Sequence, residues 1–289
     1  MTNRLALGTV QFGLPYGVAN KVGQPSLGDI RRILDAARQS GIDTLDTARS
    51  YGDSERRLGD CNMAGWRLIT KLPDRHGAQR VSDWAESCLR QSLAELKASK
   101  VEALLLHRPA LLLSADGHEL YSKLQSMKES GRVSKVGVSV YGPEELDILV
   151  SGFGLDLVQL PLNVLDRRFI KSGWLARLTD RGIEVHARSC FLQGLLLAEA
   201  GKLPDKFLRW APLWEKWTSW LRESGQSALQ ACLGFSQSLP DIHRILVGVD
   251  SEQQLQQILA AAQTPSIPPP PGLYSDDPDL INPSRWNLL

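Results

Sequence analysis

The feature that most constrains the fold of this chain is an alternation of short apolar runs with longer amphipathic segments. The alternation repeats about eight times, which is the number of strand–helix units in a parallel barrel. Most of the apolar runs are nearly continuous in Val, Ile and Leu, as expected for parallel strands buried on both faces. The expected strands cover residues 5–12, 44–48, 67–72, 101–107, 135–140, 157–160, 184–190 and 244–249.

Recognisable helix boundaries separate these runs. Ser26 followed by Asp29 resembles a capping box and predicts a helix that ends at Gly41. Further helices are expected over 82–97 and 117–130, and from near Pro143, Asp166, Gly225 and Ser251. Because each right-handed crossover returns to the same sheet, these units predict a single closed (β/α)8 TIM barrel. The alternative, a doubly wound open sheet, lacks the glycine fingerprint of a dinucleotide site after its first strand.

Two segments depart from the alternation. The first, 191–224, contains Trp210, Trp214 and Trp217 at the spacing of one helix face. A helix packed on the barrel is favoured there over an aromatic platform for substrate. The second segment is rich in proline.

This proline-rich segment holds the phrase PSIPPPPGLY, whose prolines exclude a helix or a central strand. We expect a C-terminal tail at 263–289 that lies on the surface and is anchored by Trp286. The barrel is expected at 5–262, and nothing marks an internal boundary, so residues 1–289 are expected to form one domain.

Composition narrows the possible partners and compartment. The 289 residues carry a formal net charge of +1 with both signs interspersed, which gives no sign of a nucleic-acid or membrane surface. The four cysteines form no Cys-x-x-Cys pair, so neither a disulfide framework nor a zinc site is expected. The sequence also lacks a recognisable secretory signal and a membrane-length apolar run. We therefore expect a cytoplasmic protein; no pattern indicates its oligomeric state.

Four polar residues stand at or near the ends of successive expected strands. They are Asp46 and Tyr51 in TLDTARSYG, Lys71 in RLITKLP, and His107 in ALLLHRP. Barrel enzymes place their chemistry at the C-terminal ends of strands, and adjacent strands are ~4.8 Å apart. We therefore expect these four side chains to converge on one small volume.

Together the four residues could deliver a proton to an oxygen that receives a hydride. A free tyrosine has a pKa near ~10, and a neighbouring ammonium would lower it, so Lys71 would make Tyr51 a usable general acid. Asp46 would be the counter-ion of a partly buried Lys71. His107 would donate to the substrate oxygen and orient it. The set predicts interconversion of a small-molecule carbonyl and an alcohol.

These phrases make the chain similar to the aldo-keto reductase family. The similarity runs over residues 5–262, through LALGTVQFG, GIDTLDTARSYGDSERRLG, ITKLP, LLLHRP, GRVSKVGVSVYGPEEL, DLVQLPLNVLDRR, GIEVHARSCFLQGLLL and ILVGVDSEQQL. The resemblance implies a (β/α)8 barrel that reduces aldehydes, ketones or sugars with NADPH or, less often, NADH. It places the family's catalytic tetrad on the four residues above, with Tyr51 as the acid.

The resemblance also implies residues that bind the nicotinamide. Ser139 and Gln159 match positions that hydrogen-bond its amide, whereas Val140 replaces an asparagine and loses one such contact. Arg188 stands where the family often has a tyrosine stacked on the ring. Its guanidinium could stack, bind an acidic substrate group, or form a structural ion pair. The same segment supplies three more implied cofactor positions, Ser189, Phe191 and Gly194.

The adenosine end of the cofactor is implied to lie at Gly248, Asp250, Ser251 and Gln254. A helix N-terminus is a good phosphate site in itself. However, the segment GVDSEQQLQQ has no Lys or Arg, and an acidic residue there suits the free ribose hydroxyl of NADH. NADPH is expected from the habit of the family, with NADH possible.

Two other readings remain open at this point. The departures at Val140, Arg188 and the acidic loop also fit a non-catalytic, cofactor-sensing or regulatory protein on the same fold. A metal-dependent lyase or hydrolase would need a cluster of carboxylates and histidines that the strand ends lack, so no metal is expected. The loops at 109–117, 192–224 and beyond 264 would choose the substrate, and the sequence does not name it.

Overall fold

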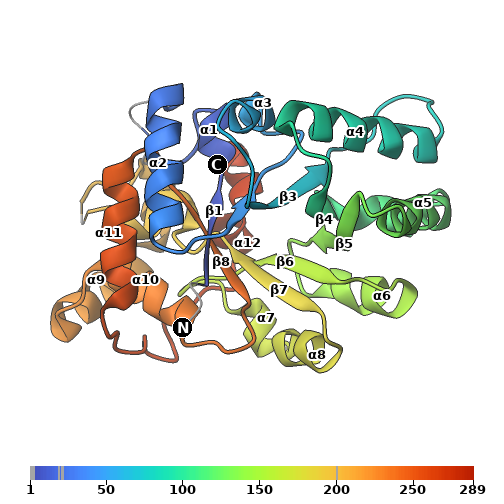
Figure 1. Cartoon of the computed structure of the whole chain (residues 1–289). Helices are drawn as coiled ribbons and strands as arrows, with labels where there is room; N and C mark the ends of the chain where they lie inside the picture. The colour runs from blue at the N-terminus through green and yellow to red at the C-terminus, as the bar shows by residue number, and fades with distance from the viewer. Residues whose placement is uncertain (1–3, 19, 21–22, 200) are drawn as a thin grey trace.

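A closed barrel of eight strands forms the centre of the molecule (Figure 1). The computed structural model describes residues 4–18, 20, 23–199 and 201–289. Each strand pairs in parallel with the next, and the eighth closes onto the first. The strands are β1 Leu5–Gly8, β2 Thr44–Asp46, β3 Arg67–Leu72, β4 Val101–Leu106, β5 Val133–Ser139, β6 Leu157–Pro161, β7 Glu184–Arg188 and β8 Arg244–Gly248. The predicted (β/α)8 barrel is confirmed.

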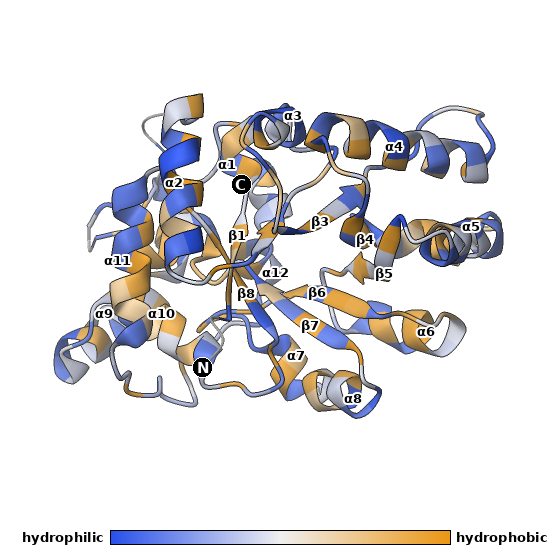
Figure 2. Ribbon diagram, viewed as in Figure 1, coloured by the Kyte–Doolittle hydropathy of each residue, from blue (hydrophilic) through white to orange (hydrophobic). Residues whose placement is uncertain are grey.

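Helices surround this barrel, and in Figure 2 they carry both apolar and polar segments. The α-helices are α1 Val10–Gly13, α2 Leu27–Gln39, α3 Ser54–Gly59, α4 Val81–Leu96, α5 Gly117–Glu129, α6 Glu144–Gly152, α7 Arg168–Lys171, α8 Trp174–Asp180, α9 Ala211–Ser224, α10 Ala228–Gln237, α11 Glu252–Gln263 and α12 Pro278–Ile281. Short 3-10 helices are η1 Pro109–Leu113, η2 Leu192–Leu197, η3 Asp205–Trp210 and η4 Pro283–Leu288. The predicted capping box is present: the Ser26 hydroxyl accepts from the Asp29 N–H, and the Asp29 carboxylate accepts from the Ser26 N–H.

Two buried layers hold the barrel together. A large apolar cluster lies between the strands and the helices, and a separate small cluster is formed by Ile69, Ala103, Leu105 and Leu157. Burying one large aliphatic side chain contributes ~1.5–3 kcal/mol relative to leaving it exposed. These packed layers fix the strand ends at which the polar residues stand.

The first expected strand is wrong in its second half. The strand ends at Gly8, and α1 follows with Phe12 fully buried. A Cβ at Gly13 would lie 1.7 Å from the carbonyl oxygen of Tyr51. The turn at Gly13 therefore depends on the close approach of the Tyr51 loop. The apolar pattern of the local sequence does not indicate this contact. The expected helix near Asp166 is likewise divided into α7 and α8.

The first irregular segment folds as expected except at Trp210. Trp214, Trp217 and Trp220 are buried in α9, which agrees with a helix packed on the barrel, whereas Trp210 is half-buried and ends η3. Trp286 in the tail is 4% exposed and lies edge-on to Phe207, with ring centroids 4.8 Å apart. Among the described residues, no helix is long and apolar enough to cross a membrane.

Candidate active site

A fully buried ion pair lies at the C-terminal ends of β2 and β3. Lys71 is 0% exposed, and its ammonium donates to Asp46 Oδ1 at 2.5 Å and to the Thr47 carbonyl at 3.0 Å. The same Nζ lies 3.5 Å from the hydroxyl oxygen of Tyr51. Asp46 and Lys71 come from two adjacent strands, and the loop after β2 brings the Tyr51 hydroxyl to them, as the strand-end spacing predicts.

A second set of contacts crosses the barrel interior from the same carboxylate. Gln159 Nε2 donates to Asp46 Oδ2 at 2.8 Å, and Ser139 Oγ donates to Gln159 Oε1 at 3.4 Å. Since β2 and β6 are not neighbours in the sheet, only closure of the barrel brings these groups together. Ser139 and Gln159 are therefore joined to the Asp46–Lys71 pair by hydrogen bonds.

His107 stands beside Tyr51 at the end of β4. The two rings meet edge to face with centroids 5.7 Å apart, and His107 Nδ1 lies 2.9 Å from Ser50 Oγ. Burial, together with the charges of Lys71 and Arg188, lowers the pKa of His107 to about 3. The imidazole is therefore neutral at pH 7, with one ring nitrogen carrying a proton.

Tyr51 is the one member of this group whose electrostatics differ from the expectation. Burial of the phenol raises its pKa above the ordinary value, and the Asp46 carboxylate adds to the rise, whereas Arg188 opposes it. The net pKa is therefore raised, and not lowered as expected, because removal from water outweighs the opposing charge around the hydroxyl. The hydroxyl keeps its proton at neutral pH, which is the form that a proton donor needs.

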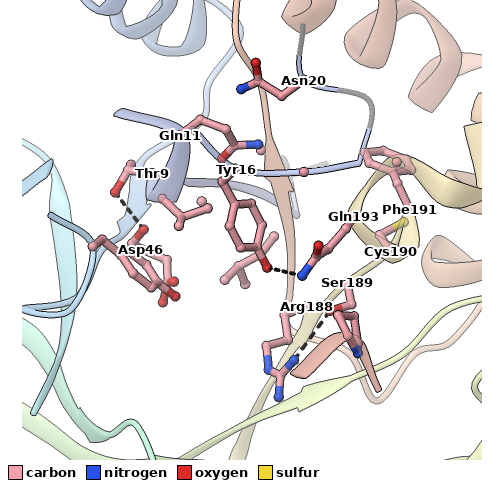
Figure 3. Close-up of a pocket in the computed structure, with 18 of the residues that line it drawn as sticks. Thr9, Gln11, Tyr16, Asn20, Asp46, Arg188, Ser189, Cys190, Phe191 and Gln193 are labelled. Atoms are coloured by element: carbon pink, nitrogen blue, oxygen red, sulfur yellow. Dashed lines mark hydrogen bonds between the residues drawn. The ribbon is translucent and has the colours of Figure 1, made fainter. Parts of the chain in front are cut away.

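A pocket of about 620 Å³ opens above these groups (Figure 3). Its size lies in the range of small-molecule and cofactor sites. The predicted residues that line it are Asp46, Tyr51, His107, Ser139, Gln159, Arg188, Ser189, Phe191, Gly194, Gly248, Asp250 and Gln254. Two predicted residues do not line it. Lys71 is fully buried next to Tyr51, and Ser251 caps α11 by accepting from the Gln254 N–H.

Several lining residues were not predicted. They include Gln11, Tyr16, Asn20, Ser50, Tyr141 and Gln193. Gln193 Nε2 donates to the Tyr16 hydroxyl at 2.8 Å and so joins the loop after β1 to the loop after β7, as Figure 3 shows. For Gln11, Tyr16, Tyr141 and Gln193 the available signal was a position after a strand, in the phrases TVQFGLPYG, SVYG and CFLQG, and Ser50 lies in TLDTARSYG.

The loop after β7 has an unusual backbone. Ser189, Leu192 and Gln193 have φ of 61°, 48° and 54°, values that side chains other than glycine rarely adopt. Such residues cluster at functional sites, where the surrounding structure maintains the strain. Here they turn the chain along the wall of the pocket.

The far end of the pocket has two features that bear on a dinucleotide. The buried Gln11 Oε1 has no hydrogen-bond partner in the described structure, and a Cβ at Gly248 would lie 2.3 Å from Gln11 Nε2. An unpaired amide oxygen and a glycine without a side chain suit a polar ligand that lies over the C-terminal ends of β1 and β8, which are paired neighbours in the sheet. Asp250 accepts from Asn20 Nδ2 at 3.3 Å nearby. The residues present therefore fit a nicotinamide dinucleotide.

Arg188 has partners other than a carboxylate. Its Nη2 donates to the Val140 carbonyl at 3.1 Å, and its guanidinium carbon lies 4.6 Å from the centroid of the Tyr141 ring. Within the described part of the chain it belongs to no ion pair, which removes support for the structural ion-pair reading. The same described residues contain no group of three His, Cys, Asp or Glu that could hold a metal ion.

Solved structures share this barrel. An aldo-keto reductase from Bacillus halodurans, in its holo form, superposes with a TM-score of 0.74 at 19% identity, covering 92% of this chain and 89% of that one. A glycerol dehydrogenase from Gluconobacter oxydans gives a TM-score of 0.70 at 21% identity, covering 92% and 88%. These likenesses establish the fold.

Curated relatives are oxidoreductases. The 6-dehydroglucose reductase of Agrobacterium fabrum is 26% identical, covering 69% of this chain and 73% of its own. The oxidoreductase sirO of Leptosphaeria maculans is 26% identical over 71% of this chain, and the match spans 65% of the length of that relative. The L-glyceraldehyde 3-phosphate reductase of Escherichia coli O157:H7 is 26% identical, covering 80% and 78%. This favours an enzyme over a cofactor-sensing protein.

The family model agrees with both comparisons. The model described as the aldo/keto reductase family matches residues 4–268, which is nearly the whole barrel with its helices. The matched region contains every residue that lines the pocket except the two contributed by the tail, Pro283 and Ser284. The chain therefore belongs to the aldo/keto reductase family of oxidoreductases.

Proposed function

We propose that this enzyme interconverts a hydroxylated aldehyde or ketone and its alcohol, with Tyr51 as the proton donor. The observation that carries the proposal is the contact of Tyr51 Oη with Lys71 Nζ at 3.5 Å, at the base of a pocket that His107 also lines. A reduced nicotinamide, when bound, supplies the hydride that adds to the carbonyl carbon. The electron pair of the C=O bond then moves to oxygen, which needs a proton.

The residues of this chain can supply that proton and hold the charges. Tyr51 gives its O–H proton to the developing alkoxide, and the phenolate left behind faces the Lys71 ammonium. Asp46 helps to keep that buried ammonium charged. When the Ser50 hydroxyl donates to His107 Nδ1, the neutral ring carries its proton on Nε2 and can donate it to the substrate oxygen.

The substrate class follows from the pocket and the relatives together. Polar side chains such as Gln193 and Ser189 line the pocket beside Tyr16 and Phe191, a mixture suited to a polyhydroxylated chain or ring. The named relatives act, by their names, on a dehydroglucose and on glyceraldehyde 3-phosphate. We propose a sugar or short hydroxyaldehyde.

For the cofactor we propose NADH ahead of NADPH, which reverses the order expected from family habit. Asp250 lines the pocket at the start of the β8–α11 turn, and burial raises the pKa of its carboxyl. The segment 248–257 carries no Lys or Arg. A carboxylate can accept from a ribose 2′-hydroxyl, whereas it repels a 2′-phosphate.

Calorimetry tests the cofactor preference without turnover. We expect the wild type to bind NADH at least ~10-fold more tightly than NADPH, and Asp250→Asn to reduce that ratio, because one repulsive charge is removed. A wild type that binds NADPH more tightly would contradict the preference and leave the reaction class untouched.

The role of Tyr51 is tested by Tyr51→Phe, assayed by absorbance of the reduced cofactor with a panel of hydroxyaldehydes and sugars. Loss of a positioned general acid should lower kcat by ~10²–10⁴-fold while cofactor affinity in calorimetry stays near that of the wild type. Tyr274→Phe is the matched control, since Tyr274 is 38% exposed on the tail. Full turnover by Tyr51→Phe would remove Tyr51 from the mechanism.

A further inference from the structure

Arg188 is held in a fixed position at the end of β7. One face of its guanidinium lies over the Tyr141 ring at 4.6 Å, Nη2 donates to the Val140 carbonyl at 3.1 Å, and Nη1 lies 3.4 Å from Ser189 Oγ. These contacts restrain the planar group and leave further N–H donors for the pocket that Arg188 lines. An arginine pre-organised in this way loses little conformational freedom when it binds a ligand.

The Tyr141 platform is itself braced. The Tyr141 N–H donates to Glu145 Oε1 at 2.6 Å, and its carbonyl accepts from Arg168 Nη2 at 3.0 Å. Arg168 is in turn paired with Asp166, which is fully buried, at 2.8 Å. A second layer of side chains that fixes the group in contact with the pocket is typical of a built binding site.

The charge of Arg188 has no counterpart at its end of the pocket. Asp46 is paired with Lys71, His107 is neutral, and in the described residues Arg188 forms no ion pair. The remaining lining carboxylate, Asp250, lies at the start of the β8–α11 turn and is engaged by Asn20. A half-buried guanidinium without an anion favours the arrival of one, and its donor fork matches a carboxylate or a phosphate.

The charge also acts at the reacting end of the pocket. Arg188 contributes to lowering the pKa of His107 and Lys71 and opposes the rise at Tyr51. Tyr51 and Arg188 also line the same pocket, so one small molecule can contact both.

We infer that Arg188 anchors an acidic group of the substrate, a carboxylate or a phosphate, while the carbonyl of that substrate meets Tyr51 and His107. This rests on the proposed carbonyl reduction and narrows its substrate to acidic hydroxyaldehydes, sugar phosphates and sugar acids. A phosphate of the dinucleotide is the other source of an anion. We assign the substrate because Arg188 lines the same pocket as Tyr51 and His107, whereas the unpaired Gln11 Oε1 and Gly248, which suit the dinucleotide, lie beside β1 and in β8.

Matched substrates separate these sources of charge. Glyceraldehyde and glyceraldehyde 3-phosphate differ by one phosphate, and butanal and succinic semialdehyde differ by one carboxylate. We expect kcat/KM of the wild type to be higher for the acidic member of at least one pair. Arg188→Gln should lower that value ~10–100-fold more than it lowers kcat/KM for the neutral member of the same pair, the scale of a lost charge-assisted contact.

Two further variants refine the test. Arg188→Lys keeps the charge without the fork, so it should recover part of the preference for the acidic substrate. Arg177→Gln is the matched control: Arg177 also stacks on an aromatic ring, Trp174 at 3.5 Å, but is 45% exposed and lies outside the pocket. It should leave both substrates unaffected.

The failures of the two proposals are distinguishable. If Arg188→Gln lowers kcat/KM equally for both members of each pair and weakens NADH binding in calorimetry, Arg188 serves the cofactor and the inference is overturned. If it changes neither, the inference is also overturned while carbonyl reduction stands. A wild type that turns over no carbonyl defeats the proposed function instead. Calorimetry with succinate and inorganic phosphate then tests the anion site independently of turnover. Equal affinities of the wild type and Arg188→Gln for these anions would count against the site.

Discussion

At the scale of single residues, the Asp46–Lys71 pair shows how function and stability oppose each other. Both side chains are nearly inaccessible to water, and placing two charges there costs several kcal/mol per ion before their attraction is counted. Burial accordingly lowers the pKa of Lys71, and Asp46 works against that shift. Under the proposed mechanism this cost is offset in function, because a buried ammonium can stabilise the phenolate of Tyr51.

This balance makes a prediction about the pair. Lys71→Met leaves Asp46 buried with only Gln159 and should destabilise the protein by ~3–5 kcal/mol in urea unfolding. The double variant Asp46→Asn/Lys71→Met removes both charges and should recover more than half of that loss. Equal destabilisation of the single and double variants would show that volume, and not an unpaired charge, determines the effect.

At the scale of elements, the sequence predicts the bounds of strands that are uniformly buried. It does not predict a strand end that is set by contact with a distant loop. β3 follows residues 67–72 as expected, because both of its faces are apolar or buried. The end of β1 depends on the approach of Tyr51 to Gly13, a tertiary contact that no local pattern records. Tyr141 and Gln193 could not be predicted as pocket-lining residues for the same reason, because their place in the wall depends on neighbours that are distant in the sequence.

The candidate site divides in a similar way. Asp46 could be predicted from its position at the end of a barrel strand, whereas Gln159 could be predicted only from the resemblance to the family. The direction of the Tyr51 pKa could not be predicted, since it depends on how deeply the ring is buried. The tether between Tyr16 and Gln193 likewise joins two loops whose paths only the folded barrel defines.

The tail gives a prediction for a whole element. Trp286 packs on Phe207, and its indole N–H donates to the Leu280 carbonyl at 3.1 Å. Trp286→Ala should release η4 from the barrel, because the exchange removes the main apolar contact of a short terminal segment. Limited proteolysis should then cleave after α12 while the barrel stays intact. Leu288→Ala is the control, since Leu288 is 79% exposed, and equal protection of both variants would contradict an anchoring role.

At the scale of the whole molecule, two kinds of titrating group make stability depend on pH in the same direction. His107 has a native pKa of about 3 against an ordinary 6.5, so unfolding takes up a proton below pH 6.5. Glu86, on α4, accepts from Arg132 and Lys123, which lower its pKa from 4.5 to about 2. Its contribution is present above pH 4.5 and is lost as the pH falls toward 2.

These windows can be separated by measuring the free energy of unfolding in urea between pH 8 and pH 3. The wild type should lose stability first below pH 6.5 and more steeply below pH 4.5, because each native pKa lies below its unfolded value. His107→Gln should flatten the upper part of the curve, and Glu86→Gln only the lower part, since each removes one proton uptake from its own window. The contradicting result is a Glu86→Gln curve whose slope differs from that of the wild type already between pH 6.5 and pH 5. The carboxylate would then be coupled to groups other than Arg132 and Lys123, and the lower window could not be assigned to this ion pair.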